Sequence, residues 1–243
     1  MDAHHQLTTG IAHDLRHEAM GLVWMVEWLI TALHDGQTAD AQTCERRLQR
    51  YVRRQVAFAR DLHDVALVTE GRSLPLHPTL VSLSELAVQL VDEVAPSIAG
   101  TAIRMSVETR PGVGAAWCDP ERTERVLRNL LRNAIAAVKA AGQAEDARIT
   151  IIIAQDGETL LRCSVVDSGC GIAPNHLTML THRFVRVRLP GMHGDGMGMG
   201  LTLSAQLVAL MGGTLTIDSS GVGMGAVASF TVPVYASGVA SGE

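Results

Sequence analysis

The chain has 243 residues, 47% of them hydrophobic, so it can form one or two domains with buried cores, yet it contains neither a membrane-length apolar run nor a signal peptide. Its net charge of −5 and its aromatic content of 3% argue against a broad nucleic-acid surface and against base-stacking platforms. The four cysteines form no Cys-x-x-Cys pair, which argues against a zinc cluster or a disulfide framework and fits a cytoplasmic protein.

Residues 1–71 are predicted to form an antiparallel helical hairpin. Apolar side chains from Leu7 to Leu33 recur at steps of three and four, which is the spacing of one helix face. Asp35 and Gly36 interrupt this pattern, and a second apolar stripe runs from Cys44 to Val65. Because one hairpin buries little surface by itself, we expect two copies to pair as a four-helix bundle in a homodimer.

His13 lies off the first apolar stripe. It stands two residues from both Ile11 and Leu15, which places it about 200° around the helix and toward solvent. Asp14 adjoins it. The same face continues through His17, Met20 and Trp24. Two other interpretations are a solvated surface histidine and a zinc site with His17 at the i, i+4 spacing, although no clear third ligand can be identified.

Residues 72–80 are predicted to be a linker, because Pro75 and Pro78 follow Gly71. The second domain is expected over residues 81–235, followed by a flexible tail at 236–243. Helices are predicted over 82–95, 119–141 and 201–211, and strands over 102–107, 148–154, 159–166, 214–218 and 227–234. Pro96 is expected to close the first of these helices. The pattern indicates an α/β domain with a mixed sheet, helices on one face and ligand-binding elements in its loops.

Two segments of this domain carry polar residues in unusual places. Asn129 and Asn133 stand four apart on one helix face and interrupt its apolar pattern, so they need a polar partner if that face is covered. Asp167 follows a strand and precedes Gly169 and Gly171. Its carboxylate could accept a hydrogen bond from an amino group while the glycines admit a flat ring. Alternatively, Asn129 and Asn133 are simply solvated, and Asp167 with its glycines is only a turn that ends a strand.

Three alternating glycines stand before the last predicted helix, at Gly196, Gly198 and Gly200, and Leu201 opens its apolar run. Glycines let the backbone approach a ligand, and a helix N-terminus directs free N–H groups outward, which favours phosphate binding. The spacing is neither the dinucleotide fingerprint nor a P-loop. By itself it is equally typical of a turn.

Taken together, these segments resemble the histidine kinases of two-component signalling, and the resemblance covers nearly all of residues 1–235. It rests on five segments in family order: 12–16 (AHDLR), 129–134 (NLLRNA), 167–172 (DSGCGI), 183–184 (RF) and 196–201 (GMGMGL). Gly223 to Phe230 is similar to the family's last glycine box. The implied fold class is α+β: an N-terminal antiparallel helical hairpin, a four-helix bundle as a dimer, followed by an α/β sandwich ATP-binding domain with a mixed sheet.

The resemblance also implies roles for individual residues. His13 would be the phosphoacceptor, with Asp14 orienting or deprotonating its ring. Asn133 would ligate Mg²⁺, and Asn129 would support it one turn earlier. Asp167 would bind the adenine amino group. The remaining ATP-binding positions are Gly169, Gly171, Gly196, Gly198, Gly200 and Leu201.

The partner implied by the resemblance is the receiver domain of a response regulator, for which His17, Met20 and Trp24 are the candidate docking face. The same Met20 and Trp24 could instead pack into the four-helix core. No sensor segment is recognisable in the sequence, so two interpretations stay open: a kinase that takes its input from a separate sensor protein, which is a further candidate partner, or a fragment of a longer kinase.

Several departures from the family pattern affect these assignments. The Lys and aromatic residue common after Asn133 are replaced by Ala136 and Ala137, so phosphate charge could be balanced by Arg128, Arg132 or the arginines at 183, 186 and 188. His63, in an Asp-Leu-His-Asp segment, is an alternative phosphoacceptor, but it lies close to the ATP domain in sequence. Two alternative functions stay open: a dimeric phosphotransfer adaptor whose ATP domain does not catalyse, and an ATP-binding kinase acting on serine.

Overall fold

The computed structural model describes residues 74–142, 146–180 and 200–235, together with helical positions scattered between residues 26 and 67. The chain divides into two compact units, Met1–Arg72 and Ser73–Glu243. The hairpin of residues 1–71 stays a prediction, because most of it lies outside the described residues. The second unit is the α/β domain described below.

A five-stranded mixed sheet with strand order β2-β4-β5-β7-β6 forms one layer of this domain. The strands are β2 (Arg104–Thr109), β4 (Arg148–Asp156), β5 (Leu160–Asp167), β6 (Leu215–Asp218) and β7 (Ala226–Pro233). β2 runs parallel to β4, and the other neighbours pair antiparallel. The mixed sheet is therefore confirmed, with strand ends shifted only slightly from the predicted ones.

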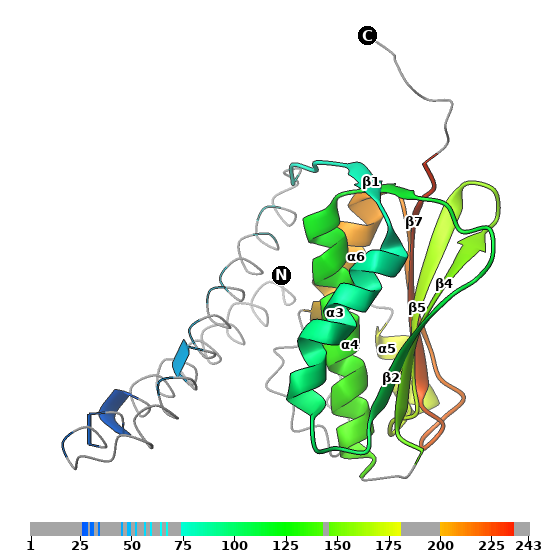
Figure 1. Ribbon diagram of the computed structural model, residues 1–243. Coiled ribbons are helices and arrows are strands. Elements are labelled where there is room, and N and C mark those ends of the chain that lie inside the picture. The colour runs from blue at the N-terminus through cyan, green and yellow to red at the C-terminus, as the bar shows by residue number, and fades with distance from the viewer. Residues whose placement is uncertain are drawn as a thin grey trace, which may run out of the picture. The chain divides into compact units, whose positions relative to one another are not determined.

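Three helices cover one face of the sheet, as predicted: α3 (Leu83–Ile98), α4 (Pro120–Ala140) and α6 (Gly200–Leu210) (Figure 1). Every second residue of the central strands points into the space between the layers, which is the alternation expected of a sheet with one covered face. The largest buried side chains there include Ile149, Ile151, Ile153, Leu161, Leu127, Leu130 and Phe230. A short helix, α5 (Pro174–Leu180), follows the loop after β5.

The start of α4 is fixed by an N-cap at Asp119. The Asp119 carboxylate accepts the N–H of Arg122 at 3.0 Å and the N–H of His77 at 2.9 Å. One side chain therefore satisfies a free donor of the first turn and also ties residue 77 to the domain. At the other end the helix stops at Ala140, and Gly142 takes a φ of +92°.

The predicted end of α3 is wrong. The helix continues through Pro96 to Ile98. A proline removes one N–H donor, but in the last turn of a helix that loss costs only one bond. The buried side chain of Ile98, which is 7% exposed, packs into the core and holds this last turn in place.

A two-stranded antiparallel sheet was not predicted. It joins β1 (Thr79–Val81) to β3 (Ala116–Cys118), and a bridge from Ala116 to Val234 connects it to the end of β7. Strands of three residues are too short to produce a readable alternation. The small sheet orders residues immediately before α3 and before α4.

Gly213 is expected to be intolerant of any side chain. A Cβ at this position, where the chain passes from α6 to β6, would overlap the backbone carbonyl oxygen of Thr231. We expect Gly213→Ala to lower the free energy of unfolding by about 3 kcal/mol in urea denaturation. The matched control is Gly114→Ala, whose new Cβ would lie 3.9 Å from Val234 and should change stability by less than about 0.5 kcal/mol. Equal stabilities of the two variants would contradict this packing argument.

Candidate functional site

One face of α4 carries the polar residues of the candidate site. Asn129, Asn133 and Ala137 are successive i, i+4 positions, so they line up along the helix. At one end, the Asn129 Nδ2 donates to the Ser204 Oγ of α6 at 3.0 Å. At the other end, the N–H of Cys170 donates to the Ala137 carbonyl oxygen at 3.1 Å. Asn133 therefore lies between the start of α6 and the loop after β5.

Asn133 is half-buried, and the structure gives its carboxamide no hydrogen-bond partner among the described residues. The carboxamide is not among the buried polar atoms without a partner, so it is open to solvent and available for a ligand. Asn129, in contrast, is already engaged by α6. The two asparagines that look equivalent in the sequence thus have different surroundings.

Asp167 ends β5 on the helix-covered face of the sheet, because it is paired with the buried Ile149. Its Oδ1 accepts the N–H of Gly169 at 2.8 Å. Burial raises the pKa of the Asp167 carboxyl above its usual value, and hydrogen bonds from the N–H groups of Gly169 and Ala226 offset this only in part. The carboxyl group is oriented by the turn and remains able to accept a hydrogen bond from an amino group.

Gly169 and Gly171 were predicted to leave room for a flat ring. The packing around them also requires glycine at both positions. A Cβ on Gly169 would overlap the backbone and side chain of Ala137, which brings the loop directly against α4. Gly171 has a φ of +65°, and a Cβ there would overlap the carbonyl oxygen of Gly221. The small side chain of Ala137 is thus complementary to Gly169.

The turn between β6 and β7 packs against the loop after β5 and is hydrogen-bonded to it. The sequence did not predict this contact. The Ser219 Oγ accepts the N–H of Ile172 at 3.0 Å and donates to the carbonyl oxygen of Gly225 at 2.6 Å. The N–H of Gly223 donates to the Cys170 carbonyl oxygen at 2.7 Å. The alternate glycines at 221, 223 and 225 were the sequence signal for this tight turn, since all three take a positive φ.

Of the three alternating glycines before α6, the structure describes only the last, Gly200. α6 begins at Gly200, followed by the half-buried Leu201, whereas Gly196 and Gly198 lie outside the described residues. A Cβ on Gly200 would overlap the Oδ1 of Asn129. The third glycine is therefore required where α6 crosses the asparagine face of α4.

Arg128 does not fit the suggested role of balancing phosphate charge. Its guanidinium pairs with Glu93 of α3 at 2.6 and 2.8 Å and also with Glu124. These hydrogen bonds raise the pKa of Arg128 and lower that of Glu93. Two carboxylates already pair with Arg128. On α4, the exposed Arg132 is therefore the better candidate for balancing phosphate charge.

The remaining predicted site residues lie outside the described residues: His13, Asp14, His17, Met20, Trp24, His63 and the arginines at 183, 186 and 188. Their roles stay predictions. Within the described ranges, no group of three His, Cys, Asp or Glu side chains is arranged to hold a metal ion. None of the described helices combines the length and hydrophobicity needed to cross a bilayer.

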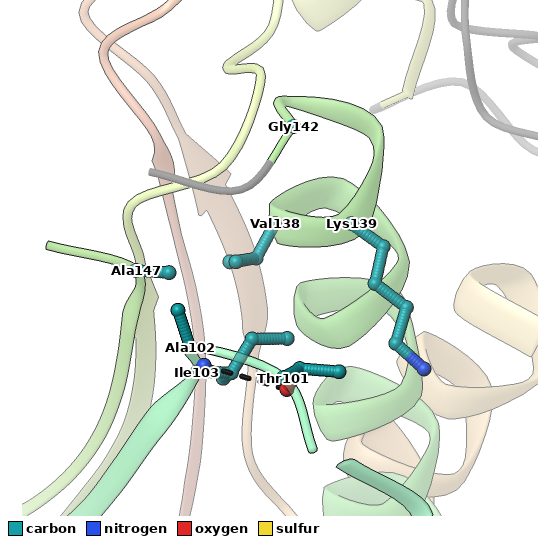
Figure 2. Close-up of a pocket in the computed structure, with 7 residues that line it drawn as sticks. All are labelled: Thr101, Ala102, Ile103, Val138, Lys139, Gly142 and Ala147. Carbon is teal, nitrogen blue, oxygen red and sulfur yellow. Dashed lines mark hydrogen bonds between the residues drawn. The ribbon is translucent and has the colours of Figure 1, made fainter. Parts of the chain in front are cut away.

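A cavity of about 200 Å³ lies at the C-terminal end of α4, away from the predicted ligand-binding residues (Figure 2). It is lined by Thr101, Ala102, Ile103, Val138, Lys139, Gly142 and Ala147. Its lining includes neither Asn133 nor Asp167. It is therefore distinct from the site on the asparagine face of α4.

Comparison with known proteins matches residues 118–236 to the family of histidine kinase-, DNA gyrase B- and HSP90-like ATPases. The sensor histidine kinase ZraS of Klebsiella oxytoca is 27% identical over 233 residues, which are 94% of this chain and 46% of ZraS. The chain thus spans less than half the length of this curated relative.

Two solved structures share the fold. The histidine kinase AdeS of Acinetobacter baumannii matches with a TM-score of 0.65 and 16% identity, over 92% of this chain and 98% of AdeS. The histidine kinase ThkA, solved in complex with the response regulator TrrA, matches with a TM-score of 0.63 and 20% identity, over 94% of this chain and 61% of ThkA.

Proposed function

Because this chain belongs to the family of two-component histidine kinases, we propose that it phosphorylates its own His13 with ATP and transfers the phosphoryl group to an aspartate of a response regulator. The observation that supports this most directly is the asparagine face of α4. It is bounded by the glycine end of α6 and by the Asp167 loop, and it leaves the Asn133 carboxamide without a protein partner among the described residues.

The residues of this site fit ATP and Mg²⁺. The Asp167 carboxyl, oriented by the N–H of Gly169, would accept the adenine amino group. The glycines at 196, 198 and 200 would hold the phosphates before α6. The Asn133 carboxamide oxygen is a hard ligand suited to Mg²⁺, which usually takes few protein ligands and completes its shell with phosphates and water. When bound, Mg²⁺ would neutralise charge that develops on the phosphate oxygens.

The first proposed step is a nucleophilic displacement at the γ-phosphorus of ATP. A neutral imidazole nitrogen of His13 forms a bond to the γ-phosphorus, the bond to the β–γ bridging oxygen breaks, and ADP leaves. Asp14 orients the ring and takes up its proton. In the second step the nitrogen–phosphorus bond breaks and a carboxylate oxygen of the receiver aspartate forms an acyl phosphate.

The proposal includes an assembly. The helical hairpin would pair as a four-helix homodimer, and His17, Met20 and Trp24 beside His13 would dock the receiver domain. A response regulator is the partner of ThkA in its solved complex, which supports this class of partner. A separate sensor protein is a further candidate partner, and we propose a cytoplasmic location.

The label chemistry of the protein tests this function. Incubation with γ-labelled ATP and Mg²⁺ should give a label that is labile in acid and stable in base, as expected of phosphohistidine. Asn133→Ala should remove the label because it removes the oxygen ligand. An acid-resistant label on a partner would favour a serine kinase instead, and no measurable ATP affinity in Mg²⁺ would favour the non-catalytic adaptor.

A further inference from the structure

We propose that Ser204 is a positioning residue that orients Asn129 in the nucleotide site and so links the start of α6 to α4. The inference rests on the proposed function, and it deepens it by assigning a role to a serine that the sequence analysis did not identify. Ser204 lies 75 positions from Asn129 in the chain, one turn after the last glycine of the glycine-rich segment.

The contact joins a buried serine to a half-buried asparagine. Ser204 is 3% exposed, and its Oγ receives the Asn129 Nδ2 at 3.0 Å. Of the two ends of the carboxamide, the nitrogen is therefore held by α6. An isolated hydroxyl at this depth would lose its interaction with water, so its contact with Asn129 satisfies both groups.

The other end of the carboxamide is limited by Gly200. A Cβ on residue 200 would overlap the Oδ1 of Asn129, so a glycine is needed for the oxygen to keep its place. Gly200 has no positive φ, and its requirement is therefore steric and not conformational. Gly200 and Ser204, four residues apart on α6, contact the two ends of one amide.

This arrangement determines which end of the Asn129 amide is left to accept hydrogen bonds. With Nδ2 bound to Ser204, the oxygen is the end without a hydrogen-bond partner among the described residues. A carboxamide oxygen accepts hydrogen bonds and binds hard cations, so Asn129 would add an acceptor beside Asn133 and would contact Mg²⁺ or its water shell. Loss of Ser204 would free the amide to rotate and would weaken the Mg²⁺–ATP complex.

The test is a double-mutant cycle on the full chain, with a non-hydrolysable ATP analogue and Mg²⁺ titrated by calorimetry. Ser204→Ala should weaken binding by about threefold to tenfold, the range of one net hydrogen bond. In the Asn129→Ala background, Ser204→Ala should cause no further loss, because Ser204 acts through Asn129. Gly200→Ala, which pushes on the same amide from its other end, should also weaken binding.

The matched control is Ser229→Ala, which removes a buried hydroxyl that donates to Ser164 at 2.9 Å on the sheet. It should leave nucleotide affinity unchanged whatever it does to the melting temperature. Equal affinity of wild type and Ser204→Ala, or the same loss with and without Asn129, would overturn the inference. If wild type itself fails to bind the nucleotide, the proposed function fails instead, so the two failures are distinguishable.

Discussion

Replacing His13 by alanine is expected to abolish the acid-labile label that the protein acquires from γ-labelled ATP. The imidazole nitrogen is the nucleophile in the proposed reaction, and no neighbouring side chain of the predicted face except His17 could replace it. Loss of an enzymatic nucleophile lowers turnover by orders of magnitude, so we expect at least about a hundredfold less label. Nucleotide affinity should stay at the wild-type value, because His13 belongs to the predicted hairpin and lies outside residues 118–236, which match the ATPase family.

The matched control is His63→Ala, since His63 also stands beside an aspartate in a predicted helix. This variant should be labelled like wild type. Full labelling of His13→Ala together with loss of label in His63→Ala would move the phosphoacceptor to the end of the hairpin. Labelling of His13→Ala that disappears only when His17 is also replaced would instead place the acceptor one helical turn later.

Asp167→Asn is expected to have opposite effects on nucleotide binding and on stability. Binding should weaken by about tenfold or more, because the amide can present its NH₂ group where an amino donor of adenine needs an acceptor. Stability without nucleotide should rise at neutral pH by at most about 1 kcal/mol, since partial exposure screens the buried charge. Asparagine can still accept the N–H of Gly169, so the turn should be preserved.

The pH dependence follows from the raised pKa of Asp167. The folded state binds this proton more tightly than the unfolded state, so the stability contributed by Asp167 falls as the pH rises from about 4 through its folded pKa. The stability advantage of Asp167→Asn should therefore be present at pH 7 and should shrink as the pH is lowered through that range. Thermal unfolding of both proteins between pH 4 and 7 measures this difference.

Asp156→Asn is the control for Asp167→Asn. Asp156 lies at the opposite end of the β4–β5 pair and forms an ion pair with Arg162 at 2.6 Å. Its replacement should leave ATP affinity unchanged. If Asp167→Asn binds ATP as well as wild type does, the adenine assignment is wrong, even if the stability effect is found.

The helices and most strands of the α/β domain could be predicted from the sequence, because their signals are local. Asp119 and Pro120 form a cap and a first turn that predict the start of α4 without knowledge of its neighbours. The alternation in β4 and β5 predicts strands with one buried face, and the glycine-rich segments identify the loops between elements. The predicted helix end at Pro96 failed because packing of Ile98 outweighed a local breaker.

Which residues meet around the site could not be predicted from the sequence and follows from the packing of α4, α6 and the loop after β5. Asn129 and Asn133 look alike in the sequence, but α6 supplies Ser204 to the first and the described structure supplies no partner to the second. Ala137 looks like a departure from the family, yet Gly169 packs directly on it. Arg128 looks available for phosphate, but Glu93 of α3 pairs with it. Each of these contacts joins segments far apart in the chain, and the free energy of burying polar groups between packed elements cannot be read from local sequence patterns.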